Sequence, residues 1–146
     1  MKKMVTRFNH PCVLVKDMKR SLRFYEGTLG LEAVRKRTAE GKCPETIYNI
    51  KGLKIDYVKL RARRDPKNMN GLLELHHWRN PKMLPGKTYN HISFSVENLD
   101  KEYRRLKKRG VKFVSRPVIA PHGQSKLCFC NDPDGNLIEF SEDLAK

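Results

Sequence analysis

The sequence predicts an α+β fold built from two tandem βαβββ modules, and a repeat within the chain carries this prediction. The segment 9–15 (NHPCVLV) recurs as 90–96 (NHISFSV). Each half also ends in an apolar strand that holds one glutamate, at 72–75 (LLEL) and at 137–140 (LIEF). Because the period is long, the pattern indicates one duplicated module rather than a solenoid of short repeats.

A helix follows each opening strand. The apolar residues of both helices are spaced i, i+4 and i+7, which gives each helix one apolar face. They are Met18, Leu22, Tyr25, Leu99, Tyr103 and Leu106. Asp17 and Asn98 precede the helices as N-caps, and Gly30 and Gly110 follow them as C-terminal caps. We therefore expect helices over 17–28 and 99–109.

Strands complete each half. Alternation of apolar and polar residues predicts strands over 8–15, 31–37, 46–50, 55–60 and 72–78 in the first half, and over 90–96, 111–116, 125–130 and 136–141 in the second. Polar, glycine-containing or proline-containing loops are expected over 38–43, 63–70 and 117–123. The turn sequence Asp132-Pro133-Asp134-Gly135 leads into the last strand.

The chain of 146 residues fits a single domain. We place module 1 at about 8–79, a linker rich in proline and glycine at about 80–88, and module 2 at about 89–142. No apolar run approaches the roughly 20 residues that a membrane span needs. The cysteine spacings are not those of a zinc ribbon, and no secretory signal precedes them. We therefore expect the four cysteines to be reduced thiols of a cytoplasmic protein.

The formal net charge of +15 has three interpretations. It could be a solvated surface, it could attract an anionic substrate, or it could bind nucleic acid. The basic run 104–109 lies on the solvent face of the second helix, because apolar residues occupy the other face. No helix-turn-helix, zinc finger or RNP-type motif accompanies the charge. We therefore expect no nucleic-acid or membrane partner, and a small-molecule substrate that could be anionic.

Strand alternation places four side chains on equivalent strand faces. They are His10, Glu74, His91 and Glu139. The other face of each strand is apolar and is expected to pack beneath the helices. Two curved mixed sheets with helices on the outside would direct all four side chains into one groove. A glutamate among leucines is unfavourable unless it is paired or binds a cation, so its recurrence predicts a metal site.

The donor types of this site limit the metal. Imidazole with carboxylate suits Zn, Ni, Co, Mn or Fe(II) rather than Ca or Mg, and we expect Zn, Ni, Co or Mn with Fe less favoured. Four protein ligands leave room for water or substrate oxygens, as in catalytic sites. Three further residues are substrate candidates: His76, in phase with Glu74; His122, in a loop; and Trp78, which could pack at the module junction or stack on a substrate.

The chain resembles the vicinal oxygen chelate superfamily, which includes glyoxalase I, methylmalonyl-CoA epimerase, fosfomycin-resistance enzymes, extradiol dioxygenases and bleomycin-resistance proteins. The resemblance covers nearly the whole chain. It is carried by His10 in segment 10–15, by 24–25 (FY) with 29–31 (LGL), by 73–75, by 91–96 and by 132–140. It implies paired modules that form a homodimer, with the metal site within one chain or across two.

The ligand order His10, Glu74, His91, Glu139 is similar to that of glyoxalase I. The epimerase has glutamine at the position of Glu74, whereas fosfomycin enzymes and dioxygenases use two histidines and one glutamate. Bleomycin-type binding proteins lack the ligand set. The glutathione-contacting arginine and asparagine of bacterial glyoxalase I correspond here to Leu14 and Trp78, so the resemblance does not support glutathione as the thiol.

The resemblance implies a lyase or isomerase that acts on a substrate with vicinal oxygens through an enediolate or enolate. Glu139 and Glu74 are the candidate bases that move the proton next to the carbonyl, and Glu139 corresponds to the base of glyoxalase I. Four alternatives remain open: an epimerase, a metal-dependent oxygenase, a fosfomycin-type transferase, and a non-catalytic binding or resistance protein.

Overall fold

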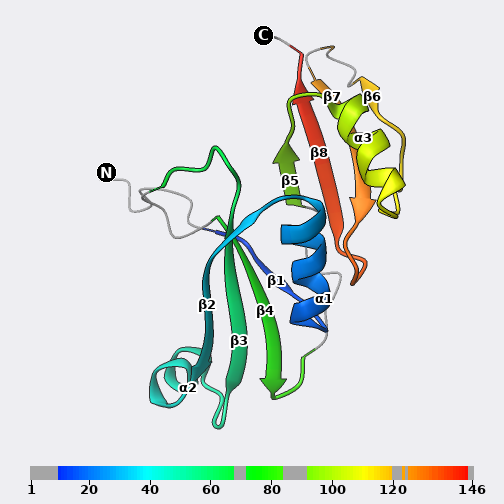
Figure 1. Cartoon of the computed structure of the whole chain (residues 1–146). Coiled ribbons are helices and arrows are strands. Elements are labelled where there is room, and N and C mark those ends of the chain that lie inside the picture. The colour runs from blue at the N-terminus through cyan, green and yellow to red at the C-terminus, as the bar shows by residue number, and fades with distance from the viewer. Residues whose placement is uncertain (1–9, 68–71, 84–91, 120–122, 124, 145–146) are drawn as a thin grey trace. The chain divides into compact units, whose positions relative to one another are not determined.

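The computed structural model describes residues 10–67, 72–83, 92–119, 123 and 125–144. The chain divides into two compact units, 1–85 and 86–146. Each unit has its own four-stranded sheet (Figure 1). None of the helices in the described ranges is long and apolar enough to cross a membrane.

The first unit holds strands β1 (Cys12–Leu14), β2 (Glu32–Glu40), β3 (Lys54–Arg61) and β4 (Leu73–Asn80) in the order β1-β4-β3-β2. β1 pairs with β4 in parallel, and the other pairs are antiparallel. Helix α1 (Met18–Leu22) continues as a π-helical turn, η1 (Arg23–Thr28), so the predicted helix over 17–28 is present with an altered last turn. A further helix, α2 (Lys42–Tyr48), joins β2 to β3.

The second unit repeats this plan. Strands β5 (Ile92–Ser95), β6 (Val118–Ile119), β7 (Ser125–Asn131) and β8 (Leu137–Asp143) form a sheet in the order β5-β8-β7-β6, with β5 parallel to β8. Helix α3 (Leu99–Lys108) follows β5. Apart from the additional helix α2 in the first unit, both units therefore have the βαβββ order and the mixed sheet that the repeat predicts.

Local capping explains where the two crossover helices begin and end. The Asp17 carboxylate accepts a hydrogen bond from the Arg20 backbone N–H at 2.9 Å, and the Asn98 side chain accepts one from Lys101 N–H at 2.9 Å. Gly30 and Gly110 follow the helices with φ of 81° and 83°, a region that favours glycine. The four sequence-predicted caps are thus confirmed.

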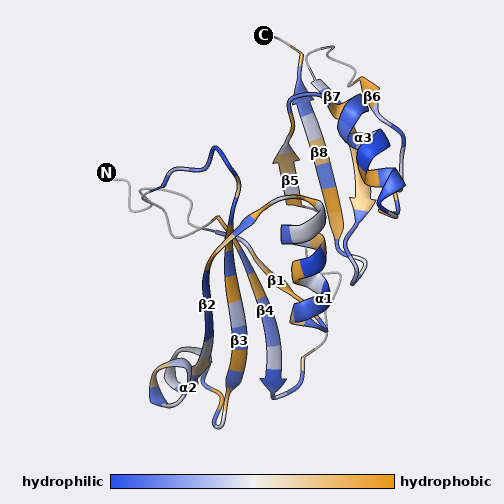
Figure 2. Ribbon diagram, in the orientation of Figure 1, coloured by the Kyte–Doolittle hydropathy of each residue, from blue (hydrophilic) through white to orange (hydrophobic). Residues whose placement is uncertain are grey.

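Each sheet buries one face in the core of its own unit. In the first unit Val13, Val15, Tyr25 and Leu75 are at most 1% exposed. In the second unit the most buried residues come from α3, β7 and β8, and they are Leu99, Leu106, Cys128, Cys130 and Ile138. Figure 2 shows hydrophobic and hydrophilic residues alternating along β3 and β8, as expected for strands with unlike faces.

The prediction of a loop over 38–43 and a strand over 46–50 is wrong. β2 extends to Glu40, and helix α2 occupies 42–48. Gly41, with φ of 84°, ends the strand, and Asn49, with φ of 53°, ends the helix in the left-handed region. Pro44 lies in the first helical turn, where its missing N–H costs nothing. The alternation of residue types over 46–50 therefore does not indicate a strand in this chain.

The prediction of a strand over 111–116 is also wrong, and so is the loop prediction at 118–119, whereas residues 120–122 of that loop lie outside the described residues. Only an isolated bridge, Phe113 to Cys130, occurs in the first segment, and β6 lies in the second. The Phe129 carbonyl accepts from both the Val114 and Ser115 N–H groups, at 2.8 and 3.4 Å. Two residues facing one is the pattern of a bulge, which interrupts the ladder. Pro117, which has no N–H, prevents continuous pairing before β6.

Candidate metal centre

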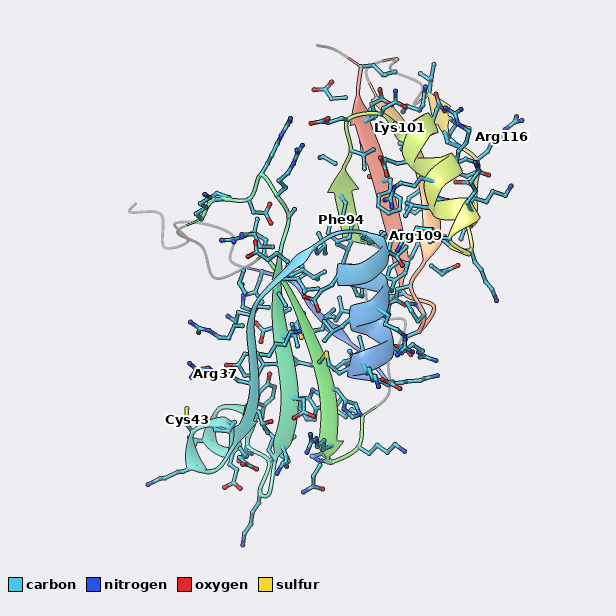
Figure 3. The ribbon with its side chains drawn as sticks, in the orientation of Figure 1. Arg37, Cys43, Phe94, Lys101, Arg109 and Arg116 are labelled. Carbon is cyan, nitrogen blue, oxygen red and sulfur yellow. The ribbon has the colours of Figure 1, made fainter. Side chains whose placement is uncertain are left out.

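One face of the first sheet, the site face, carries the polar side chains of the candidate metal centre. Because strand side chains alternate, this face lies opposite the one that bears Val13 and Leu75. Strand register places its residues in two neighbouring rows that cross all four strands. The rows are Cys12, Glu74, Lys59 and Arg35, and then Leu14, His76, Tyr57 and Arg37. Figure 3 shows Arg37 extending from β2.

Glu74 lies at the centre of a cluster of nitrogen groups. Its Oε2 is 3.0 Å from His10 Nε2 and 3.4 Å from Lys59 Nζ. Its Oε1 is 2.7 Å from His76 Nε2. Glu74 and His76 are each 8% exposed. The structure therefore brings together three sequence-predicted residues, His10, Glu74 and His76, within the first unit.

The surroundings of Glu74 keep its carboxylate ionised. Burial by itself raises the pKa of a carboxyl group, but the hydrogen bond with His76 and the electrostatic interactions with Lys59, His76 and His10 together outweigh it. The pKa of Glu74 consequently lies below its usual range. A buried, charged carboxylate with two imidazole nitrogens beside it has the donor types that Zn, Ni, Co and Mn prefer.

Glu139 occupies the corresponding place in the second sheet. It faces Ser93 across the β5–β8 pair, and the Ser93 hydroxyl donates to Glu139 Oε1 at 2.8 Å. Its neighbours in the strand, Ile138 and Phe140, are buried on the other face. His91, one residue before β5, lies outside the described residues. In the described ranges no three His, Cys, Asp or Glu side chains are grouped as a metal site.

Trp78 packs inside the first unit. It is 6% exposed and forms an apolar cluster with Leu53 and Ile55. The Tyr48 ring of α2 contacts it edge-on, with ring centroids 5.2 Å apart. Its indole N–H has no hydrogen-bond partner among the described residues. Helix α2 thus covers the end of the site face where Trp78 lies. The third substrate candidate, His122, lies outside the described residues.

Four site-face residues were missed from the sequence: Arg35, Arg37, Tyr57 and Lys59. Their strands were predicted, but their rows depend on how β2 pairs with β3. That register shifts between Ala33 and Arg35 because of a β-bulge. The contact of Lys59 with Glu74 follows from the β3–β4 register, which strand alternation alone does not supply.

Sequence comparison relates the chain to proteins with similar patterns. A family model described as Glyoxalase/Bleomycin resistance protein/Dioxygenase superfamily matches residues 7–140. The chain is 31% identical over 144 residues to glyoxalase I of Saccharomyces cerevisiae, which covers 90% of this chain but 43% of the yeast protein. It is 28% identical over 138 residues to a probable lactoylglutathione lyase of Synechocystis, covering 94% of this chain and 95% of that protein.

Solved structures share the fold. A glyoxalase family protein from Bacillus cereus superposes with a TM-score of 0.81 at 20% identity, covering 99% of this chain and 98% of that one. The trypanothione-dependent glyoxalase I of Leishmania major gives a TM-score of 0.65 at 24% identity, covering 94% and 87%. An antibiotic-binding protein from Streptomyces gives 0.68 at 22% identity, covering 97% and 99%. Enzymes and a binding protein therefore share this architecture.

Proposed function

Because this chain belongs to the Glyoxalase/Bleomycin resistance protein/Dioxygenase superfamily, we propose that it is a metal-dependent, glyoxalase I-like lyase or isomerase. Its substrate would carry two adjacent oxygen atoms, and the reaction would pass through an enediolate or enolate. The observation that carries the proposal is the buried Glu74 carboxylate with His10 Nε2 at 3.0 Å. Relatives named lactoylglutathione lyase support the lyase class.

Four residues are proposed to hold the metal: His10, Glu74, His91 and Glu139. The donor set fits a divalent transition metal, because His10 Nε2 and Glu74 Oε2 lie close together and carry the right atom types. When bound, the metal would supply Lewis-acid chemistry that polarises a substrate carbonyl. The lowered pKa of Glu74 suits a ligand, since its carboxylate holds no proton at neutral pH that a cation would have to displace.

Glu139 is proposed as the base. It would take the proton from the carbon next to the substrate carbonyl and return it to the neighbouring carbon, so that no atom is gained or lost overall. The hydrogen bond from the Ser93 hydroxyl, 2.8 Å from Oε1, would fix the orientation of the carboxylate. Glu74 is less suited to proton transfer, because His10, His76 and Lys59 already stabilise its charge.

The thiol that accompanies the substrate is proposed to differ from glutathione. The family positions that contact glutathione are occupied by Leu14 and Trp78, and both belong to the apolar cluster beneath α2. Neither offers a charge to a peptide carboxylate. We therefore expect weak or no activity with the glutathione adduct of methylglyoxal and higher activity with another 2-oxoaldehyde adduct or an acyl-CoA epimer.

Metal analysis of untagged protein tests the ligand set. We expect about one Zn, Ni, Co or Mn per chain in the wild type and loss of that metal in Glu74→Ala and in Glu139→Ala. Glu102→Ala, which removes a surface carboxylate paired with Arg105, is the matched control and should keep the metal. Iron retained in Glu74→Ala would contradict the four-ligand proposal in favour of a three-ligand oxygenase. Absence of metal from the wild type would favour a binding protein.

Turnover tests the base. Glu139→Gln keeps an oxygen ligand but removes the basic group, so it should retain metal and lose nearly all activity on the substrate found by screening. Retained activity in this variant would contradict the role of Glu139. Mixing Glu74→Ala with Glu139→Ala distinguishes a site within one chain from a site across the proposed homodimer, because only the second arrangement regains metal in mixed dimers.

A further inference from the structure

The cations of β2 and β3 differ in whether they have an acidic partner. Lys36 pairs with Glu26 at 3.2 Å and Lys54 with Glu40 at 2.8 Å. Arg61 pairs with Glu32 at 2.6 Å. By contrast, Arg35 and Arg37 form no ion pair with any described residue. These two arginines are also the ones that lie on the same sheet face as Glu74.

Register concentrates positive charge beside the candidate metal centre. Arg35 lies directly opposite Lys59, and Lys59 lies directly opposite Glu74. Like charges facing each other across a strand pair destabilise a sheet. Glu74 relieves this repulsion only in part, because its two oxygens also contact His10 and His76. The row therefore holds an excess of positive charge that described residues do not neutralise.

The neighbouring row adds the hydroxyl group of Tyr57, and an apolar row follows it. Arg37 lies opposite Tyr57, a half-buried residue whose ring centroid is 6.1 Å from that of His76. The next row is apolar, with Ile55 and Trp78 beneath α2. Along the site face, the Glu74 carboxylate and the cations are therefore followed by the Tyr57 hydroxyl and then by the apolar residues beneath α2. Such a surface can hold a small molecule that has a charged group and an apolar part.

We propose that Arg35, Arg37 and Lys59 bind an oxyanion group, a carboxylate or a phosphate, of the substrate whose reacting oxygens lie at Glu74. This inference rests on the proposed function and assigns its substrate class. Arg35 is two strands from Glu74, a separation of roughly 10 Å at the usual strand spacing. Guanidinium groups bind carboxylates and phosphates through paired N–H donors, and the Tyr57 hydroxyl can donate a further bond.

Titration with inorganic phosphate and with acetate tests the site in the whole 146-residue chain, before and after removal of metal by a chelator. Binding is followed by amide chemical shifts in ¹⁵N-labelled protein at constant ionic strength set with NaCl. We expect shifts centred on residues 35–37 and 57–59, and at least roughly tenfold weaker phosphate binding in the Arg35→Gln/Arg37→Gln double variant. Phosphate carries more charge than acetate at neutral pH, so acetate binding as strong as that of phosphate would identify a carboxylate-bearing substrate. Binding of phosphate without detectable binding of acetate would identify a phosphate-bearing one.

Lys36→Gln is the control for position, since it removes one positive charge from the same strand on the opposite face, against the two that the double variant removes. It should bind phosphate like the wild type. Equal binding by the double variant and the wild type, or equal weakening in Lys36→Gln, would overturn the proposal. Anion binding that depends on Arg35 and Arg37 in wild-type protein that contains no metal as purified, before any chelator is added, would refute the proposed enzyme and leave the anion site standing. The two failures are therefore distinguishable.

Discussion

His76 is expected to tune metal affinity although it is not a proposed ligand. Its Nε2 lies 2.7 Å from Glu74 Oε1, and both residues are 8% exposed. A buried hydrogen bond to a charged group contributes about 1.5–3 kcal/mol. Since about 1.4 kcal/mol corresponds to a factor of ten, His76→Ala should weaken metal binding roughly 10- to 100-fold. This matches the usual effect of removing a group that orients a metal ligand.

A competition titration against a chromogenic chelator measures this affinity in chelator-stripped, refilled protein. His77→Ala is the control, because His77 lies on the opposite face of β4 and contacts Asp56 at 3.8 Å rather than Glu74. It should bind metal as the wild type does. His76→Gln retains a donor and should recover part of the loss. A dissociation constant for His76→Ala within threefold of the wild-type value, in protein that is still folded, would refute the reasoning.

Three other predictions concern stability and reactivity. Trp78→Ala should lower the free energy of unfolding by about 3 kcal/mol, the lower end for such truncations because the cluster is small; urea titration measures it, and a change below about 1 kcal/mol would contradict the packing. Burial raises the pKa of Asp56, but hydrogen bonds from Thr38 and Arg79 together with the electrostatic interactions of Arg79 and His77 outweigh it, so the pKa is lowered. The ionised Asp56 therefore stabilises the fold fully above its unfolded pKa near 3.8, and this contribution is lost as the pH falls through the folded pKa. The difference in unfolding free energy between wild type and Asp56→Asn should consequently shrink only below about pH 4. The exposed Cys43 should react with iodoacetamide before Cys128 and Cys130, because these two are buried and burial raises their pKa values to about 11 and 12. Peptide mapping after timed alkylation measures the order, and earlier modification of Cys128 or Cys130 would contradict it.

The fold was predictable because period-two alternation and helix spacing repeat in both halves. Glu74 interrupts a run of leucines in β4, and this alone places it on the face opposite Leu73 and Leu75. The same reasoning put His76 in phase with Glu74. Alternation does not give distances between side chains, so only the structure shows that Glu74 and His76 are in contact.

Register was the part that the sequence could not supply. The bulge between Ala33 and Arg35 decides which basic residues of β2 share a face with Glu74. Helix α2 was not predicted for a different reason. A short helix depends on its caps and on packing more than on periodicity. Its signals were Pro44 in the first turn and Asn49 at its end, and both are weaker than the alternation that suggested a strand.

Lys59 connects the two proposed sites. Its ammonium group shares Glu74 Oε2 with His10 Nε2, at 3.4 and 3.0 Å, so a metal ion bound to that oxygen would compete with Lys59 for it. Displaced from Glu74, Lys59 would still lie opposite Arg35 and would add its full charge to the oxyanion site. Metal binding and oxyanion binding would therefore strengthen each other, and the coupling would have to be equal in both directions. Because Lys59 lies between Arg35 and the Glu74 carboxylate, the sheet should favour a ligand that both chelates a metal and carries a negative charge.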